Sequence, residues 1–172
     1  MINWRDKSPA FYDAVTLAHY LSAKDTRVAS TAAFVAAAAG SGSFASGVAA
    51  GVSAFGKFHA PITAARVFLF CGGKPYQKPI PGWGNSFHKD GIAPQWREAY
   101  YFAKKELSFS QNQLVREVNI RLGPKGIYPN AAFCTAVLAE VCGVPPNTEL
   151  ALAIPPRVTA WAEMFNSYQK EN

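Results

Sequence analysis

The sequence has few cysteines and no long apolar segment, and both features exclude whole classes of protein. Its three cysteines form no Cys-x-x-Cys pair, and their odd number argues against a disulfide framework. We therefore expect reduced thiols and a cytoplasmic setting. The longest apolar run, residues 31–40, is too short to span a bilayer. The charged N-terminus lacks the apolar core of a signal peptide, so we expect no membrane association.

Metal and nucleic-acid binding also lack the patterns that they require. The three histidines have no spacing that suits a zinc site, so we expect no metal, and no Ser/His/Asp arrangement can be defended. The net charge of +6, from 17 Lys and Arg against 11 Asp and Glu, favours an anionic partner. The basic residues are scattered, however, and form no run of five or more. We therefore expect no nucleic-acid partner and favour a phosphate-bearing small molecule.

Helical spacing dominates the rest of the sequence. The chain has 172 residues, of which 49% are hydrophobic, and this is enough for one substantial core. After a start signal at Ser8-Pro9, the apolar residues Phe11, Val15, Ala18 and Leu21 form one stripe. No β-strand alternation or internal repeat emerges. We predict an all-α chain that forms one unit over residues 1–172.

Start and stop signals divide this unit into helices and one long loop. Asp25 or Thr26 should cap the second helix, and small residues in the third should let other helices approach it closely from all sides, at the centre of a bundle. Residues 71–92 are rich in glycine and proline, and a loop this long is usually functional or mobile. The predicted helices cover residues 9–21, 26–39, 44–55, 59–70, 94–105, 110–121, 131–141 and 156–168.

Judged by their local sequence context, only the histidines are candidates for catalytic residues. His59 follows a glycine turn at a predicted helix start, where backbone N–H groups favour a neutral, hydrogen-bond-donating imidazole. We interpret His19 as an ordinary histidine at the polar edge of its helix. His88 and Lys89 lie in the Gly-rich loop, where a functional pair and a solvated basic pair are both open.

Four stretches, whose order and gaps agree with one another, resemble the citrate synthase family. Residues 127–165 are the most specific, with Tyr-Pro-Asn, a helix, a Gly-x-Pro break and Arg-x-x-x-Trp. Residues 47–65 are similar to the family's Ala-rich helix and Gly-x-x-His turn, and residues 28–31 to its Asn-Ala-Ser-Thr helix start. Residues 80–91 resemble its Gly-rich loop next to coenzyme A. The resemblance covers most of the chain.

The resemblance implies a multi-helical citrate synthase-like fold that corresponds to the C-terminal half of a full family member. Residues 1–75 would form large-domain helices, and residues 76–165 a small-domain-like region with the coenzyme A loop. Family members join an acyl-CoA to a keto acid by a Claisen-type condensation, or cleave such a product as citryl-CoA lyases. A carboxylate removes the α-proton of the thioester, and preorganised donors stabilise the enolate oxygen. Coenzyme A, as an acyl-CoA substrate, is the expected ligand.

Several family positions are retained in this sequence. His59 falls on the histidine that polarises the keto acid, and it would be catalytic. Arg157 falls on an arginine that holds a substrate carboxylate, a task suited to its bidentate guanidinium. The positions that the resemblance places against the coenzyme are Gly82, Trp83, Gly84 and Lys89.

Other family positions are changed. Ala132 stands where the family has its catalytic carboxylate, and an alanine cannot remove a proton. Asp25 stands where the enolate-stabilising histidine belongs, and Asn85 and Ser86 occupy the places of a substrate-binding His-Arg pair. The chain should therefore not catalyse the family reaction by the family mechanism.

Three functions remain open. The chain could be a subunit of an acyl-CoA-dependent enzyme that forms or cleaves carbon–carbon bonds, completed by a second copy or by a companion resembling the absent N-terminal half. Such a partner would also cover the apolar face of the helix over residues 44–55. Alternatively, the chain is a non-catalytic structural or regulatory partner, which Ala132 favours. In the third reading it is a repurposed enzyme in which burial raises the pKa of Asp25, although the same residue is also an ordinary helix cap.

Overall fold

The chain folds into helices packed around one central helix. The computed structural model describes residues 4–55, 61–84 and 88–171. These residues contain eight α-helices, three short 3-10 helices and no strand, apart from one isolated bridge between Trp83 and Pro129, which confirms the predicted all-α class. The elements are η1 (Trp4–Lys7), α1 (Pro9–Ser22), α2 (Ala29–Ser41), α3 (Phe44–Ser53), α4 (Ile62–Phe70), η2 (Pro94–Trp96), α5 (Arg97–Glu106), α6 (Phe109–Leu122), η3 (Gly123–Lys125), α7 (Ala131–Cys142) and α8 (Leu150–Glu171).

Local signals define the ends of α6 and α7. Helix α6 begins with a capping box, in which Ser108 Oγ accepts from Gln111 N and Gln111 Oε1 accepts from Ser108 N at 2.8 Å. Helix α7 begins at Asn130, whose Oδ1 accepts a hydrogen bond of 2.9 Å from Ala132 N. It ends at Gly143, which adopts the left-handed conformation with a φ of 66°. The predicted start of α7 is therefore confirmed.

Helix α2 begins later than predicted, because Asp25 does not cap it. The cap position belongs to Val28, and the helix begins at Ala29. The Asp25 carboxylate instead accepts from Arg27 N at 3.0 Å and from the Arg27 guanidinium. This local pairing competes with the N-cap hydrogen bond, and it holds residues 25–27 in a turn.

Helix α8 begins earlier than predicted. Pro156 suggested a first helical position, yet the helix starts at Leu150 and contains both Pro155 and Pro156. The two prolines remove two backbone hydrogen bonds from the early turns of the helix. Burial of Leu152 and Ala153 in the core offsets this loss.

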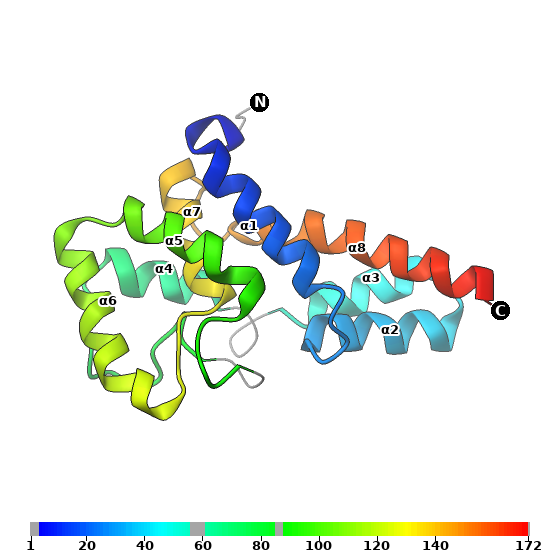
Figure 1. The fold of residues 1–172 in the computed structure, drawn as a ribbon. Helices are drawn as coiled ribbons and strands as arrows, with labels where there is room; N and C mark the ends of the chain where they lie inside the picture. Colours follow the sequence, from blue (N-terminus) through cyan, green and yellow to red (C-terminus); the bar gives the residue numbers. More distant parts are fainter. Residues whose placement is uncertain (1–3, 56–60, 85–87, 172) are drawn as a thin grey trace.

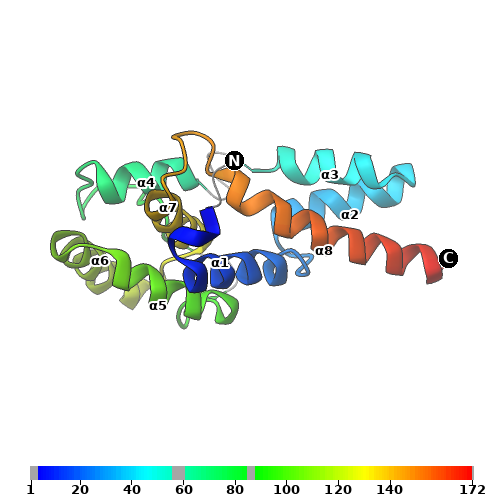
Figure 2. The ribbon, with the colours of Figure 1, turned by 90° about the horizontal axis from the view of Figure 1, so that it is seen from above.

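Helix α7 is the centre of the larger of two cores. It packs against α1, α4 and α5, and most of its residues are buried. In Figures 1 and 2, α4 to α7 lie on one side of the molecule, and α2, α3 and the C-terminal half of α8 extend to the other. Helix α8 joins the cores, with Leu152 and Ala153 in the larger and Ala160 and Trp161 in the smaller. Among the described residues, none of the helices is both long and apolar enough to cross a membrane.

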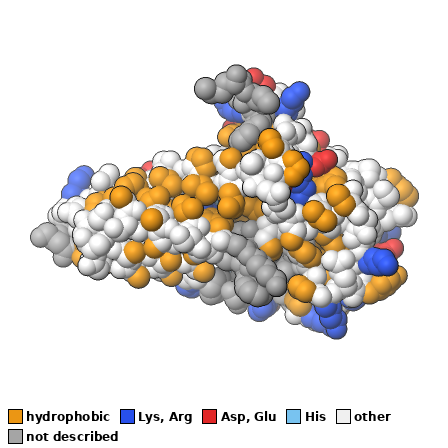
Figure 3. Space-filling view, turned by 180° about the vertical axis from the view of Figure 1, so that it is seen from behind, with side chains coloured by type: hydrophobic (Ala, Val, Ile, Leu, Met, Phe, Trp, Pro, Cys, Tyr) orange, Lys and Arg blue, Asp and Glu red, His pale blue; other side chains and the backbone are white. Residues whose placement is uncertain are grey.

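Helix α3 shows the predicted close approach, but only on one side. A Cβ atom built on Gly51 would lie 2.5 Å from a ring carbon of Trp161, and one on Gly47 would lie 2.8 Å from Phe34. The prediction that α3 lies at the centre of a bundle is wrong, because it packs mainly on α2 and more lightly on α8. Its opposite side is exposed, as are several alanines of α2. Seen from behind, hydrophobic side chains cover much of this part of the molecule (Figure 3).

Candidate functional site

The predicted site residues that the structure describes lie in three places. Arg157 is inside the protein on α8, Asp25 is on the turn after α1, and the Gly-rich loop packs on the segment that leads into α7. His59, Asn85 and Ser86 lie outside the described residues.

Arg157 is a buried cation with polar partners from two helices. Only 2% of its surface is exposed. Its NH1 group donates to Ser30 Oγ at 3.0 Å, and its Nε group donates to His19 Nδ1 at 3.3 Å. The guanidinium carbon lies 5.1 Å from the centre of the Phe55 ring. No carboxylate lies within ion-pair distance of it among the described residues. Burial lowers the pKa of Arg157 to about 10, so it stays charged at neutral pH.

His19 belongs to the same buried cluster, and the prediction of a polar-edge position is wrong. The side chain is completely buried. His19 Nε2 lies 2.8 Å from Thr135 Oγ1, which itself donates to the carbonyl of Ala131. Because the hydroxyl proton is used there, Nε2 must carry the imidazole proton, and Nδ1 accepts from Arg157. Burial, and then the charge of Arg157, lower the pKa of His19 well below 6.5. The imidazole is therefore neutral.

A signal for the burial of His19 was present in the spacing. His19 is four residues after Val15 and eight after Phe11, both of which are fully buried. The predicted stripe continued to Leu21 instead, but Leu21 is 43% exposed. The buried face of α1 thus includes the polar residue His19, which a hydropathy pattern alone does not assign to a buried face.

The Gly-rich loop is attached by its backbone to the segment that leads into α7. Gly84 N donates to Tyr128 O at 2.9 Å, and Asn130 N donates to Gly82 O at 2.9 Å. Asn130 Nδ2 also donates to Gly84 O at 2.8 Å. Gly82 has a φ of 87°, and a Cβ atom there would lie 3.3 Å from Phe133. The position therefore requires glycine, and Asn130 both caps α7 and holds the loop.

Trp83 anchors this loop in the interior of the protein. It is 8% exposed, and its ring lies edge-on to Phe68 and Phe133, with ring centres 5.7 and 5.1 Å away. Its Nε1 group donates to Asn119 Oδ1 at 2.8 Å. Gly84 differs, because it has a φ of 106° and no atom of the described residues, its chain neighbours aside, lies within 4 Å of a Cβ built on it. Of the predicted coenzyme residues, Lys89 is exposed and Gly84 is partly exposed, whereas Gly82 and Trp83 are buried.

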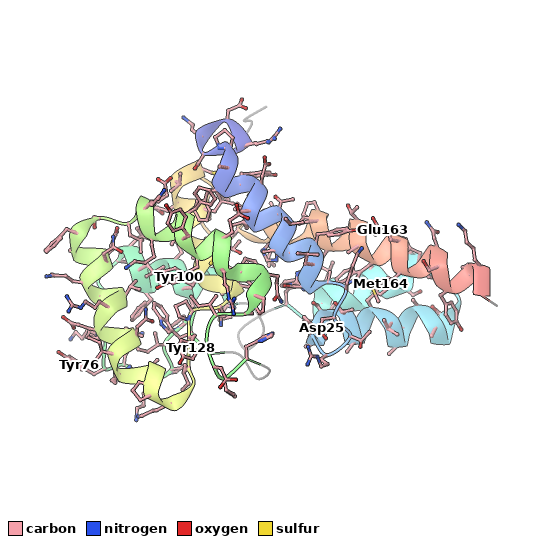
Figure 4. All side chains as sticks on the ribbon, in the orientation of Figure 1. Asp25, Tyr76, Tyr100, Tyr128, Glu163 and Met164 are labelled. Carbon is pink, nitrogen blue, oxygen red and sulfur yellow. The ribbon has the colours of Figure 1, made fainter. Side chains whose placement is uncertain are left out.

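Two positions bear on the missing base: Ala132, which stands in its place, and Asp25, the alternative. Ala132 is 1% exposed in the first turn of α7 and provides no acid or base. Asp25 is bound by Arg27 through hydrogen bonds of 2.7 and 2.9 Å, on the turn after α1 (Figure 4). Hydrogen bonds from Arg27 lower the pKa of Asp25 more than burial raises it, and the electrostatic effect of His88 also lowers it. The repurposed-enzyme hypothesis needs a raised pKa.

The thiols and the remaining polar groups do not suggest another centre. Cys134 and Cys142 are buried, and burial raises the pKa of both thiols. Cys71 is exposed. Within residues 4–55, 61–84 and 88–171, no three His, Cys, Asp or Glu side chains are grouped so that they could hold a metal ion.

Comparison with known proteins identifies the fold. No family model and no curated protein match the sequence. The structure resembles citrate synthase from the thermophilic archaeon Thermoplasma acidophilum, solved as a ternary complex with carboxymethyl coenzyme A and oxaloacetate. The TM-score is 0.67 and the sequence identity 21%, and the match covers 90% of this chain and 49% of that one. It also resembles citryl-CoA lyase from Hydrogenobacter thermophilus, with a TM-score of 0.64, 22% identity, and coverage of 91% and 69%. The chain has a citrate synthase-like fold, as predicted, and spans about half the length of the first of these proteins.

Proposed function

We propose that this chain is a subunit of an acyl-CoA-dependent enzyme that forms or cleaves a carbon–carbon bond, and that it works with a second copy or a companion chain. Arg157 would hold a substrate carboxylate, and His59 would polarise the keto group. Gly84 and Lys89 would face coenzyme A, and the buried Gly82 and Trp83 would hold the loop in position. The partner would supply the catalytic base, because Ala132 has no group that can remove a proton.

The buried charge of Arg157 carries this proposal. A buried cation is costly unless it is paired, and no described residue offers Arg157 a carboxylate. Neutral partners, Ser30 and His19, position the guanidinium without neutralising it. A ligand carboxylate would supply the missing charge and a bidentate pair. Phe55 contacts the guanidinium, and His59 follows it four residues later in the sequence.

The coenzyme side of the proposal depends on Gly84 and Lys89. No described atom, its chain neighbours aside, lies near the Cβ position of Gly84, so a ligand could approach the backbone there. The N–H and C=O groups of Gly84 already form hydrogen bonds with Tyr128 and Asn130. These hydrogen bonds hold the backbone of Gly84 in place, and charge recognition falls to Lys89, an exposed lysine that suits a phosphate. Coenzyme A, when bound, supplies the thioester that acidifies the α-carbon.

The surface of α2 and α3 supports the need for a partner. Exposed alanines on the two helices, together with Val35, form an apolar region without large charged side chains (Figure 3). Such a region favours burial against another chain. None of the three cysteines, all of which lie in the described part of the chain, is joined in a disulfide, which is consistent with the reducing, cytoplasmic setting that we propose.

Coenzyme A binding tests the proposal. Coenzyme A should raise the melting temperature of the chain, alone or with its copurifying partner, because binding to the native state stabilises it. Lys89→Gln should weaken binding by about fivefold, since a lysine–phosphate contact contributes roughly 1 kcal/mol. Lys78→Gln removes the same charge from an exposed lysine of the same loop, and it should bind like the unchanged chain. No stabilisation at saturating coenzyme A, with or without the partner, would contradict the proposal.

A non-catalytic role on the same scaffold is the second candidate. Two observations favour it: Ala132 has no group that could act as the base, and the lowered pKa of Asp25 makes its carboxylate a weaker base than usual. In this case the chain would be a structural or regulatory partner. A complex that binds coenzyme A but leaves every acyl-CoA thioester unchanged would support this role.

A further inference from the structure

Trp83 lies between two residues whose backbone conformations favour glycine. Gly82 and Gly84 have φ angles of 87° and 106°. Glycine reaches this region without steric cost, but it is equally free to leave it. Local backbone preference therefore does not hold the loop in one conformation. The position of the loop depends on the side chain between the two glycines and on the groups that bind it.

The indole N–H of Trp83 has a polar partner on α6. Trp83 Nε1 donates to Asn119 Oδ1 at 2.8 Å, and Asn119 Nδ2 donates to the OH group of Tyr100 on α5 at 3.2 Å (Figure 4). Because an indole N–H can only donate, the oxygen of the amide must face Trp83, and the nitrogen faces the phenol. Asn119 is thus held by Tyr100 on one side and holds Trp83 on the other.

The chain that follows α6 also contacts the second residue of the candidate coenzyme surface. A Cβ atom built on Gly126 would lie 2.9 Å from the backbone oxygen of Lys89. Gly126 follows the short helix η3, which comes directly after α6. Helix α6 and the turn after it therefore support the loop at two places, through the Asn119 side chain and at Gly126.

We propose that Asn119 is a positioning residue for the coenzyme A loop. Its amide holds the Trp83 indole against α6, and the indole in turn holds Gly84 where it faces the coenzyme. Asn119 acts through Trp83 and does not itself contact the ligand. The identity of the ligand rests on the proposed function, whereas the anchoring is a property of the chain without a ligand.

Loss of the Asn119 oxygen would leave the indole N–H without its acceptor. Trp83 is only 8% exposed, and a buried donor without a partner is destabilising. The ring could recover an acceptor by turning towards solvent, which would move the glycines on either side of it. The expected consequence is a local opening of the loop that other changes in α6 do not cause.

Amide hydrogen exchange of Gly84 measures this opening without a ligand, because Gly84 N donates to Tyr128 O in the closed loop. Asn119→Leu keeps the approximate size of the side chain and removes the acceptor, and in the full chain it should speed exchange at Gly84 about tenfold. The matched control is Asn112→Leu on the same helix, because the Asn112 amide donates to the carbonyls of Lys104 and Leu107. It should lower the melting temperature and leave exchange at Gly84 unchanged.

A double substitution separates the hydrogen bond from a general loss of packing. Trp83→Phe removes the donor but keeps an aromatic ring beside Phe68 and Phe133. In that background, Asn119→Leu should change exchange at Gly84 by less than about twofold, because the bond that it breaks is already absent. A tenfold effect in both backgrounds would overturn the inference, as would equal exchange in Asn119→Leu and the unchanged chain.

Coenzyme A titration connects the anchor with binding. Asn119→Leu should raise the Kd for coenzyme A about fivefold, and Asn112→Leu should leave it unchanged, because only the first lowers the population of the closed loop. Faster exchange at Gly84 with an unchanged Kd would overturn the positioning role. If the unchanged chain, with its partner present, does not bind coenzyme A, the proposed function fails, and the exchange measurements still decide whether Asn119 holds the loop.

Discussion

Replacing His19 by glutamine should remove a pH dependence from the folding stability of this chain. His19 is buried and neutral, and its Nδ1 atom accepts from the Arg157 cation. A proton on Nδ1 would abolish that hydrogen bond and place two positive charges side by side. A glutamine could accept from Arg157 through its oxygen and donate to Thr135 through its nitrogen, but it does not titrate.

The magnitude follows from proton linkage. The unfolded histidine has a pKa near 6.5, and the folded one lies well below this value. As the pH falls below 6.5, the unfolded chain takes up the proton first, so the free energy of unfolding falls by about 1.4 kcal/mol for each pH unit. The contribution is fully present above the unfolded pKa. Between about pH 7.5 and about pH 5.5, it should fall by about 1.4 kcal/mol in the unchanged chain and not in His19→Gln.

Urea denaturation at a series of pH values measures this difference. All other ionisable groups are the same in both proteins, so their contributions cancel in the difference. The paired carboxylates of Asp13 and Asp25 have lowered pKa values, so they contribute mainly below about pH 5. The difference between the two proteins therefore isolates His19. The same slope in both proteins would refute the neutral, Arg157-bound imidazole, as would a stability that rises as the pH falls.

Two further substitutions test the packing of α3 and the role of Asp25. Gly51→Ala should destabilise the chain by about 1–3 kcal/mol in thermal unfolding, because its Cβ would overlap the buried Trp161 ring. The control is Gly40→Ala in α2, where no described atom outside the adjoining backbone of the helix lies near the added Cβ; it should be neutral or stabilise by up to about 1 kcal/mol. Equal effects of the two substitutions would contradict the close approach of α3 to Trp161. Asp25→Asn should cost less than about 1 kcal/mol, because the pair with Arg27 is partly exposed. It should leave any thioester activity of the complex unchanged, and a loss of a hundredfold or more would support Asp25 as the base.

Much of the candidate site was predictable only through the family resemblance. The loop at Gly82 to Gly84 and the arginine at position 157 were identified by motif and order, and the structure places both against buried partners. Composition alone does not indicate that Trp83 points inward, because an aromatic residue in a glycine-rich loop is equally compatible with a ligand platform. Its contacts with Phe68, Phe133 and Asn119 come from three different helices.

The sequence by itself determined the helical class and the ends of the helices that have strong local caps. Asn130, the Ser108–Gln111 capping box and Gly143 act through neighbours within a few residues, so their effect is readable along the chain. Tertiary structure alone decided which polar groups bind His19 and that α8 begins at Leu150. Those outcomes depend on α1, α7 and α8 meeting in space, where buried surface and the shared hydrogen bonds of His19 outweigh local propensity.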